Sequence, residues 1–352
     1  MDGLVATFKI GHRQVGPEHP CFIIAEAGVN HGGDMDLAIH LIDVASGAGA
    51  DAVKFQTFKA DTLVTTAAEK AAYQKRTTGS TETQFEMLRK LELPPESFSK
   101  LAAYCRERSI AFMSTPFDEE SVEALDGLMS VIKIPSGELT NLPFIEFVAK
   151  RSLPVILSTG MSTMSEVQTA VNVIRQYNSS GLAVLHCVSN YPALPAETNL
   201  RCMEAIARAC NAPVGLSDHS EGICIAVAAV ALGACVIEKH FTTDRNLPGP
   251  DHRASLEPRE LGALVEAIRT VEQALGDGIK GPTAAEIDTA AVVRRSLVSA
   301  CPLKAGARVA RGSIVIRRPG TGLPPAALDD IVGRVVRRDV PAGVLLNLDM
   351  FE

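Results

Sequence analysis

Two lysines lie inside apolar segments of the sequence, where a charged side chain is unusual. Lys54 stands in the run VKFQ and Lys133 in the run IKIPS. Because an unpaired ammonium group is costly to bury, each lysine is expected to have an anion nearby. Together with Ser and Thr donors, two such cations suit a phosphate or carboxylate ligand. The alternative is that one lysine forms a Schiff base, which needs a lowered pKa that a second lysine could supply.

Two histidines follow similar apolar segments, His219 in GLSDHS and His240 in EKHFT. If these segments are neighbouring strands, the two imidazoles lie side by side. Such a pair can hold a divalent metal ion, with a glutamate, water or substrate completing the coordination. Two independent structural histidines are the alternative. The GLSDHS segment also leads towards a helix N-terminus, which is a common phosphate-binding position in barrels.

Polar groups follow all the apolar runs, and Glu26 and Glu138 among them are the candidate acid and base groups. The residues in these positions are Glu26, Asn30, His31, Lys54, Gln56, Ser114, Thr115, Lys133, Ser136, Glu138, Ser158, Thr159, His186, Ser189, Asn190, Tyr191, Ser217, Asp218, His219, Glu238, Lys239 and His240. A lone buried polar residue usually serves the structure. Polar groups at the end of every run indicate a binding site instead.

The elements that must position these groups are short apolar runs that alternate with amphipathic helical patterns. The predicted strands are Cys21–Ala27, Ala52–Thr57, Ile110–Thr115, Val131–Ser136, Pro154–Thr159, Leu182–Val188, Pro213–Asp218 and Val236–Phe241. Helical spacing (i, i+3, i+4, i+7) between them is seen in Ala38/Leu41/Ile42/Ala45 and in Val167/Ala170/Val171/Ile174, and a last helix is predicted to end near Gly276. Strands that are apolar throughout are typical of a parallel sheet buried on both faces.

Eight strand–helix units within about 255 residues predict an α/β protein with a (β/α)8 barrel over residues 1–276. An open sheet would be expected to carry GxGxxG after its first strand, whereas EAGVNHGG follows here. In a barrel the carboxyl ends of the strands share one face, so the polar groups converge there. The long connection 58–94 is predicted to be a loop that acts as a partial lid.

The character of the sequence changes after Gly276. Residues 277–290 are predicted to be a linker, and 291–352 a small β-rich domain with strand-like runs at Ser296–Ala300, Ser313–Ile316, Ile331–Val336 and Val344–Leu348. This tail has ten basic and five acidic residues, a net charge of +5, whereas the preceding 290 residues have 24 basic and 36 acidic, a net charge of −12. The tail is therefore expected to meet an anionic surface or ligand.

Composition excludes several classes of function. The net charge of −7 argues against general nucleic-acid binding, and 5% aromatic residues without Trp leave few stacking platforms. Eight scattered Cys show no CxxC or zinc-finger spacing, which is typical of a reduced, cytosolic protein. Residues 1–10 lack a signal-peptide pattern and the longest uncharged run, 222–237, is too short to span a membrane. We therefore expect a cytoplasmic protein with neither nucleic acid nor membrane as a partner.

Nine segments, in order along the chain, together resemble the sialic acid (nonulosonate) synthase family. They are IAEAGVNHGGD (24–34), AVKFQTFKAD (52–61), MSTPFD (113–118), KIPSGEL (133–139), STGM (158–161), GLSDHS (215–220), EKHFT (238–242), GPDHRASLEP (249–258) and RRPGTG (317–322). The resemblance implies a (β/α)8 barrel followed by an antifreeze-like (SAF) domain. It also implies condensation of phosphoenolpyruvate (PEP) with an open-chain N-acetylated mannosamine-type sugar. In that reaction C3 of PEP attacks the aldehyde, water adds at C2, and phosphate leaves with C–O cleavage.

The resemblance also implies a role for individual residues. Glu138 matches a carboxylate near the reacting centre, and Glu26 and Gln56 match active-site residues beside it. His219 and His240 match ligands of Mn²⁺ or Mg²⁺, the metal that holds the aldehyde oxygen. The implied PEP-binding residues are Lys54, Thr115, Lys133, Ser136, Ser158, Ser189 and Ser217, and the implied sugar contacts are Asn190, Tyr191, Asp251 and Arg318.

Arg318 matches an arginine that one subunit inserts into the site of its partner, which implies a domain-swapped homodimer. The sequence departs from some family members at Ser189, where they have Asn, and at Val292, where they have an aromatic residue. Both departures concern the sugar side of the site. N-acetylneuraminate is the first expectation for the product and N,N'-diacetyllegionaminate the alternative, since the segment GPDH resembles these two types more than the pseudaminate type. A Schiff-base barrel aldolase and a non-enzymatic carbohydrate-binding protein are more distant alternatives.

Overall fold

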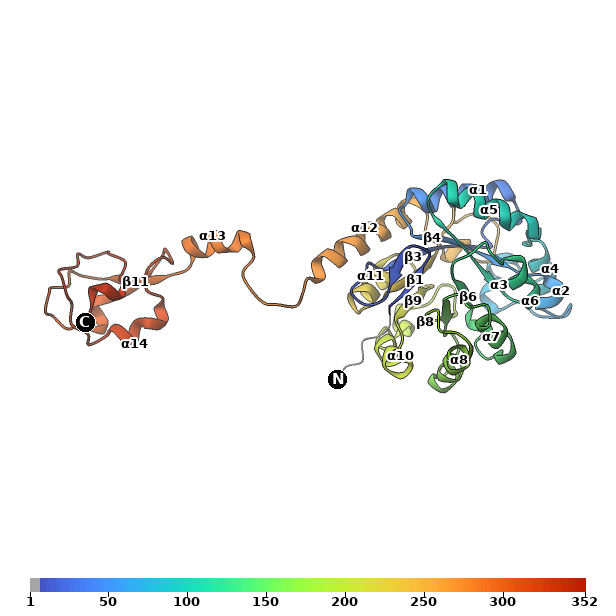
Figure 1. Cartoon of the computed structure of the whole chain (residues 1–352). Helices are drawn as coiled ribbons and strands as arrows, with labels where there is room; N and C mark the ends of the chain where they lie inside the picture. Colours follow the sequence, from blue (N-terminus) through green and yellow to red (C-terminus); the bar gives the residue numbers. More distant parts are fainter. Residues whose placement is uncertain (1–6) are drawn as a thin grey trace. The chain divides into compact units, whose positions relative to one another are not determined.

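The computed structural model of the chain describes residues 7–352. Residues 1–6, part of the segment 1–10 in which we expect no signal peptide, lie outside the described part. Two compact units divide after Gly276 (Figure 1). The first is built on an eight-stranded parallel sheet in the order β5-β4-β3-β10-β9-β8-β7-β6. Its strands are β3 (Phe22–Gly28), β4 (Ala52–Thr57), β5 (Ala111–Pro116), β6 (Ile132–Ile134), β7 (Val155–Ser158), β8 (Leu182–Cys187), β9 (Val214–Asp218) and β10 (Val236–His240). The end strands β5 and β6 also contact each other, so the sheet is a nearly closed barrel, as predicted.

A helix follows each strand and packs on the outside of the barrel (Figure 1). These helices are α1 (Met35–Gly47), α5 (Pro95–Glu107), α6 (Glu119–Ala124), α7 (Leu142–Ala149), α8 (Met164–Tyr177), α10 (Cys202–Cys210), α11 (Cys224–Ala231) and α12 (Pro258–Leu275), with the short α9 (Pro195–Thr198) before α10. The side chains with helical spacing in the sequence are the buried ones in α1 and α8, which confirms the periodicity. Within residues 7–352, no helix is both long and apolar enough to cross a membrane.

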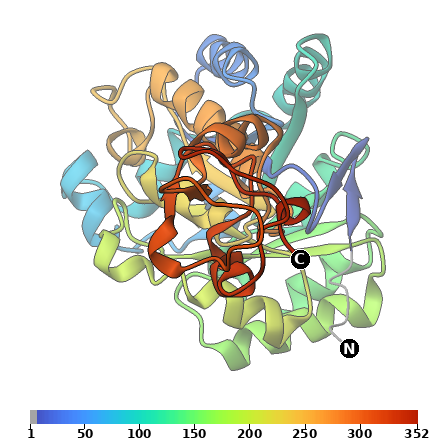
Figure 2. The same cartoon turned by 90° about the vertical axis from the view of Figure 1, so that its left-hand side faces the viewer.

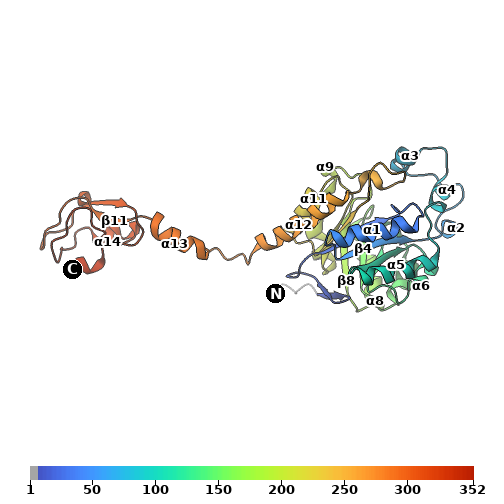
Figure 3. The same ribbon diagram turned by 90° about the horizontal axis from the view of Figure 1, so that it is seen from above.

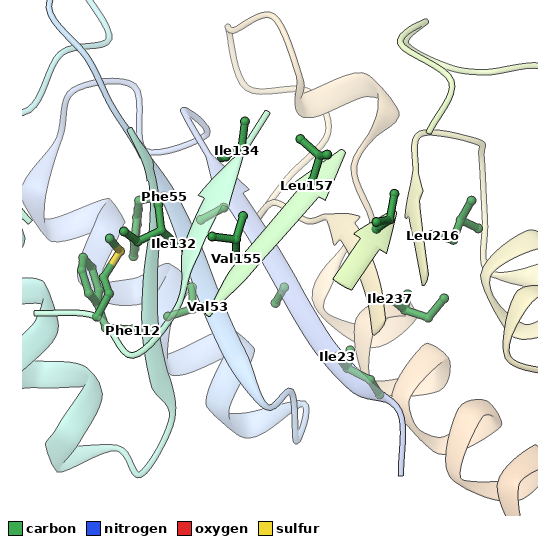
Figure 4. Close-up of a cluster of buried hydrophobic side chains, with 14 of the residues drawn as sticks. Ile23, Val53, Phe55, Phe112, Ile132, Ile134, Val155, Leu157, Leu216 and Ile237 are labelled. Carbon is green, nitrogen blue, oxygen red and sulfur yellow. The ribbon is translucent and has the colours of Figure 1, made fainter. Parts of the chain in front are cut away.

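Alternate residues along each strand belong to two different cores. Side chains such as Val53, Phe55 and Ile132 pack with helix residues such as Leu41 between the barrel and the helices (Figure 4). The other set fills the barrel interior, and includes Ile24, Ala52, Met113, Val131, Ile156 and Val236. The hairpin of β1 (Phe8–Ile10) and β2 (Arg13–Val15), dark blue in Figure 2, packs on this interior set near the amino ends of the strands. Polar residues in register with the interior set therefore meet at the opposite, carboxyl end.

Residues 58–94 do not form the irregular loop that the sequence predicts. They contain three short helices, α2 (Ala60–Leu63), α3 (Ala72–Thr78) and α4 (Gln84–Arg89), which lie at one end of the barrel (Figure 3). The start of α4 is fixed by Thr83, whose backbone N–H donates to Glu86 at 2.8 Å while its hydroxyl accepts from the Glu86 N–H. We call the segment 58–94 the lid.

The second unit is small and has its own core of Leu297, Leu303, Val309, Ile314, Ile331, Val336, Val340, Leu346, Met350 and Phe351. It contains α13 (Ala284–Val293), the antiparallel pair β11 (Ser296–Ser299) and β12 (Ile314–Arg317), and α14 (Leu328–Ile331). Two expectations are wrong in detail. The second half of the predicted linker 277–290 is helical, since α13 begins at Ala284, and the runs 331–336 and 344–348 form isolated bridges rather than strands.

Candidate active site

A cavity of about 460 Å³ opens at the carboxyl ends of the barrel strands, and every strand of the barrel contributes to its lining. The residues predicted for the site that line it are Glu26, Lys54, Gln56, Thr115, Lys133, Ser136, Glu138, Ser158, Ser189, Tyr191, Ser217, His219, His240 and Asp251. Asn190 is exposed and does not line the cavity. Arg318 is exposed in the second unit.

The two lysines lie on the floor of the cavity and are almost completely buried. The ammonium group of Lys54 donates to Thr115 Oγ1 at 2.7 Å and pairs with a Glu26 oxygen at 2.7 Å. That of Lys133 lies 3.4 Å from a Glu238 oxygen. Burial opposes the charged form of Lys54, but Glu238 and Glu26 outweigh burial and raise its pKa, whereas burial dominates at Lys133 and lowers its pKa. Lys54 is therefore a permanent cation and a poor Schiff-base nucleophile.

Glu238 was predicted only as one of the polar groups at the strand ends, without a role in the site, yet it lines the cavity. One of its oxygens accepts from Ser217 Oγ at 2.9 Å, and the other lies 3.6 Å from the Lys54 ammonium. Burial alone would raise the pKa of Glu238, but Lys133, Lys54 and Ser217 lower it to about 2. This carboxylate thus pairs with both lysines and offsets the cost of burying them. Its signal in the sequence was its place in EKH, two residues before His240, in register with the interior set.

Serine hydroxyls surround the lysines. Ser158 Oγ is buried and has no hydrogen-bond partner among the described residues, which leaves it free for a ligand. Ser136 Oγ accepts from the Gly160 N–H at 2.9 Å. A Cβ atom at Gly160 would lie only 2.1 Å from Ser189 Oγ, so the glycine of STGM is what lets Ser136 and Ser189 come together. Lys54, Lys133 and the hydroxyl groups around them thus combine two cations with hydrogen-bond donors, as a phosphate or carboxylate ligand requires. We call this group the clamp.

His219 and His240 lie beside the clamp, with ring centroids 5.5 Å apart. His219 Nδ1 lies 2.8 Å from the Val188 carbonyl oxygen, and donation there leaves a lone pair on Nε2. Burial, assisted by the positive charges of His219 and Lys54, lowers the pKa of His240 well below its ordinary value, and its Nδ1 has no hydrogen-bond partner in the described part of the chain. Burial opposes the charged form of His219, but Cys187 and the Val188 carbonyl outweigh burial and raise its pKa, so only His240 is held neutral. Binding of a divalent ion by the two imidazoles, with water and substrate in the other positions, would release the proton of His219. No cluster of three or more His, Cys, Asp or Glu side chains suited to a metal occurs within residues 7–352.

Glu26 is the carboxylate best suited to proton transfer. Burial, with Glu238 nearby, raises its pKa to about 7 even though Lys54 opposes the shift. Gln56 Nε2 donates to Glu26 Oε1 at 3.2 Å. A Cβ at Gly28 (φ +54°) would lie 3.3 Å from atoms of Gln56, Glu26 and His240, so a glycine there allows the three side chains to converge. Glu138, at the cavity edge, accepts from Asn141 Nδ2 at 2.7 Å.

Aromatic rings connect the histidines to the lid. The Tyr191 ring lies 4.0 Å from that of His219, and the Tyr73 ring of α3 stacks on Tyr191 at 4.8 Å. Asp251 is buried beside them, and burial raises its pKa to about 6. The lid residues Tyr73, Gln74 and Gln84 also line the cavity. Sequence reasoning missed them because it treated 58–94 as an irregular loop, which offers no periodicity to indicate which side chains face inward.

The cavity thus combines two buried lysines with hydroxyl donors, two neighbouring imidazoles and the Glu26 carboxylate, whose pKa is raised to about 7. A profile of the NeuB family matches residues 41–280, and one of the SAF domain matches residues 294–352. The chain belongs to the NeuB family. Members of the NeuB family include the N,N'-diacetyllegionaminic acid synthases of Legionella pneumophila and Campylobacter jejuni, each 46% identical to this chain. The matches cover 97% and 92% of this chain and 98% of each relative.

Among solved structures, the N-acetylneuraminic acid synthetase of Leptospira borgpetersenii, in complex with citrate, is 35% identical. It superposes with a TM-score of 0.72 over 82% of this chain and 96% of its own. The NeuB-family relatives are synthases, so this chain is an enzyme, and the alternatives of a carbohydrate-binding protein and a Schiff-base aldolase are wrong.

Proposed function

We propose that this enzyme condenses PEP with 2,4-diacetamido-2,4,6-trideoxymannose to form N,N'-diacetyllegionaminate. The observation that supports the reaction is the pair of buried cations, Lys54 and Lys133, beside His219 and His240 in one cavity. A phosphorylated carboxylate suits the cations, and a carbonyl compound suits a metal held by the histidines.

The choice of acceptor corrects the first expectation, which was N-acetylneuraminate. Two relatives at 46% identity are named for N,N'-diacetyllegionaminic acid, whereas the solved structure named for N-acetylneuraminic acid is 35% identical. These identities favour the legionaminate product, the alternative considered from the sequence.

The residues divide the work of the reaction between them. Lys54, Lys133 and Ser158 bind the phosphate and carboxylate of PEP, and Glu238, which accepts from Ser217, lies beside both lysines. A bond forms between C3 of PEP and C1 of the aldehyde, and water adds at C2. One proton of the water passes through Glu26 to the former aldehyde oxygen. The C2–O bond to phosphate then breaks, and the remaining hydroxyl proton leaves with phosphate as C2 becomes a ketone. Glu26 takes the proton of that water, which its pKa of about 7 permits. A Mn²⁺ or Mg²⁺ ion bound by His219 and His240 would polarise the acceptor carbonyl.

Release of phosphate from PEP tests this proposal. With Mn²⁺ and the diacetamido acceptor, the enzyme is expected to release one phosphate per nine-carbon acid formed. PEP labelled with ¹⁸O at its bridging oxygen is expected to deliver the label to phosphate, since the C–O bond breaks. Retention of the label in the acid, or no turnover with either this acceptor or N-acetylmannosamine, would refute the reaction.

A further inference from the structure

One wall of the active-site cavity is apolar, although the substrates are polar. Four buried residues from the lid and the barrel rim form a separate hydrophobic cluster, and three partly buried residues pack on it. All seven line the cavity, and they are Val29, Phe58, Leu63, Met87, Leu88, Leu91 and Phe117. Val64, partly buried in the lid, extends the same wall.

The lid, which contributes five of the seven wall residues, also reaches the histidines through Tyr73. The Tyr191 ring lies 4.0 Å from that of His219, tilted by 33°, and Tyr73 stacks on Tyr191 at 4.8 Å, so the rings lead from the candidate metal-binding histidines to α3 of the lid. The lysines that suit PEP lie on the barrel floor, at the ends of β4 and β6. An acceptor with its aldehyde at the histidines therefore extends towards the lid.

An apolar wall distinguishes sugars by their substituents. A hydroxyl group that turns towards it loses its hydrogen bonds to water without replacement, whereas a methyl group gains by leaving water. The lid residues Gln74 and Gln84 line the same cavity as the wall. Gln74 Oε1 accepts from the Ala71 N–H at 2.9 Å, so its NH₂ group can donate to an acyl oxygen.

We propose that the lid selects the acceptor through this wall and these two amides, favouring a sugar with a methyl group at C6 and an acylamido group at C4 over one with hydroxyls there. The inference rests on the proposed function and adds the part of the chain that decides the acceptor. It places the specificity in 58–94 rather than at the strand ends, which hold the groups for PEP and metal.

The test compares kcat/KM for two acceptors, 2,4-diacetamido-2,4,6-trideoxymannose and N-acetylmannosamine, with PEP and Mn²⁺ in each assay. In Leu88→Gln the preference for the first acceptor is expected to fall about tenfold or more, as for the loss of one or two apolar contacts. Val64→Thr adds a hydroxyl with almost no change of shape and is expected to shift the ratio in the same direction. The KM for PEP should stay the same in both variants.

Phe85→Gln is the matched control, because Phe85 lies on α4 but does not line the cavity. A ratio has the advantage that partial unfolding lowers both rates alike. If the wild-type enzyme prefers N-acetylmannosamine, the proposed acceptor is wrong and this inference fails with it. If the wild type prefers the diacetamido sugar but Leu88→Gln and Val64→Thr leave the ratio unchanged, the lid does not select the acceptor although the proposed function stands. If neither acceptor reacts, the proposed function fails and this inference with it.

Discussion

The Lys239 ammonium lies 2.7 Å from the Asp218 carboxylate, and this buried ion pair stands directly behind the two candidate metal ligands. Asp218 precedes His219 and Lys239 precedes His240, and the two are paired across β9 and β10. The other Asp218 oxygen accepts from the N–H and the hydroxyl of Ser220, at 2.9 and 2.7 Å. The pair therefore fixes the separation of the two strand ends that carry the histidines.

Replacement of one partner should loosen both the fold and the metal site. Lys239→Met leaves a buried carboxylate unpaired, and we expect it to lower the free energy of unfolding by about 3–5 kcal/mol. Mn²⁺ affinity, measured by electron paramagnetic resonance, is expected to fall by tenfold or more in the folded fraction. The double variant Lys239→Met/Asp218→Asn should recover part of the stability but not the metal affinity. Unchanged Mn²⁺ affinity in both variants would show that the ion pair is structural only.

Ser158 offers a separation of binding from stability. Because its hydroxyl has no partner in the described protein, Ser158→Ala should leave the free energy of unfolding nearly unchanged. The KM for PEP is expected to rise about tenfold, since a hydrogen bond to a charged ligand is lost. The neighbour Thr159 provides a control, because its hydroxyl already has a partner in the protein: it donates to the Leu185 carbonyl at 2.9 Å. Thr159→Ser retains that hydroxyl and should change neither quantity, whereas an unaltered PEP KM in Ser158→Ala would exclude the serine from the clamp.

Acid should destabilise the barrel through His31. Burial lowers the pKa of His31 to about 4, against about 6.5 for an unfolded histidine. Below pH 6.5 the unfolded chain binds the proton and the folded chain does not, so stability is complete above pH 6.5 and is lost as the pH falls towards 4. The loss amounts to about 3 kcal/mol. The free energy of unfolding, measured by urea titration at each pH from 7 to 4, should fall less steeply with pH in His31→Gln than in the wild type. His40→Gln, on the exposed side of α1, should keep the wild-type slope.

Removal of metal should abolish turnover reversibly. After treatment with EDTA the enzyme is expected to lose phosphate release and to regain it with Mn²⁺. His219→Ala should lose bound Mn²⁺ by electron paramagnetic resonance as well as activity. His186→Gln is the control, because His186 faces away from the cavity and bonds the Thr198 carbonyl at 2.6 Å. Full activity in the chelated enzyme would contradict the metal role.

Arg318 allows a test of the domain-swapped dimer. Lys133→Ala and Arg318→Ala are each expected to be nearly inactive, the second through a raised KM for the sugar. If the tail of one copy completes the site of the other, a 1:1 mixture refolded together contains one intact site in each mixed dimer. About a quarter of the wild-type activity should then return, since half of the dimers are mixed at random. A mixture as inactive as its components would mean that Arg318 does not act in the partner's site.

The barrel and most of the cavity could be predicted because both depend on the period of two along buried strands. Lys54 and Lys133 face the cavity, as expected, since they continue the interior sets that contain Ala52 and Val131. The same alternation places His186 on the outer side, although the sequence put it among the polar strand ends without distinction. Register, not residue type, decides which polar groups meet.

The second unit and the lid could be predicted less well, because their short segments depend on tertiary contacts. The run 331–336 is rich in β-branched residues, yet only single bridges such as Arg308–Val335 and Val336–Phe351 form there. In the lid, the capping box of Thr83 and Glu86 and packing on Phe58 help to determine the helices. Each of these helices is too short for a helical repeat of apolar residues to show in the sequence. Glu238 was expected at a strand end, but its role could not be predicted because it depends on distances to two lysines from other strands.

The junction between the end strands β5 and β6 gives the ligand a second role. Strands β5 and β6 touch, but their described residues form no hydrogen-bonded ladder. Thr115 lies on β5 and Lys133 on β6. A ligand held by both side chains would therefore bridge the two strands that no backbone hydrogen-bond ladder joins. We therefore expect β5 and β6 to move relative to each other more freely than hydrogen-bonded neighbours do. A substrate bound by both strands would restrict that movement and so complete the barrel wall that binds it.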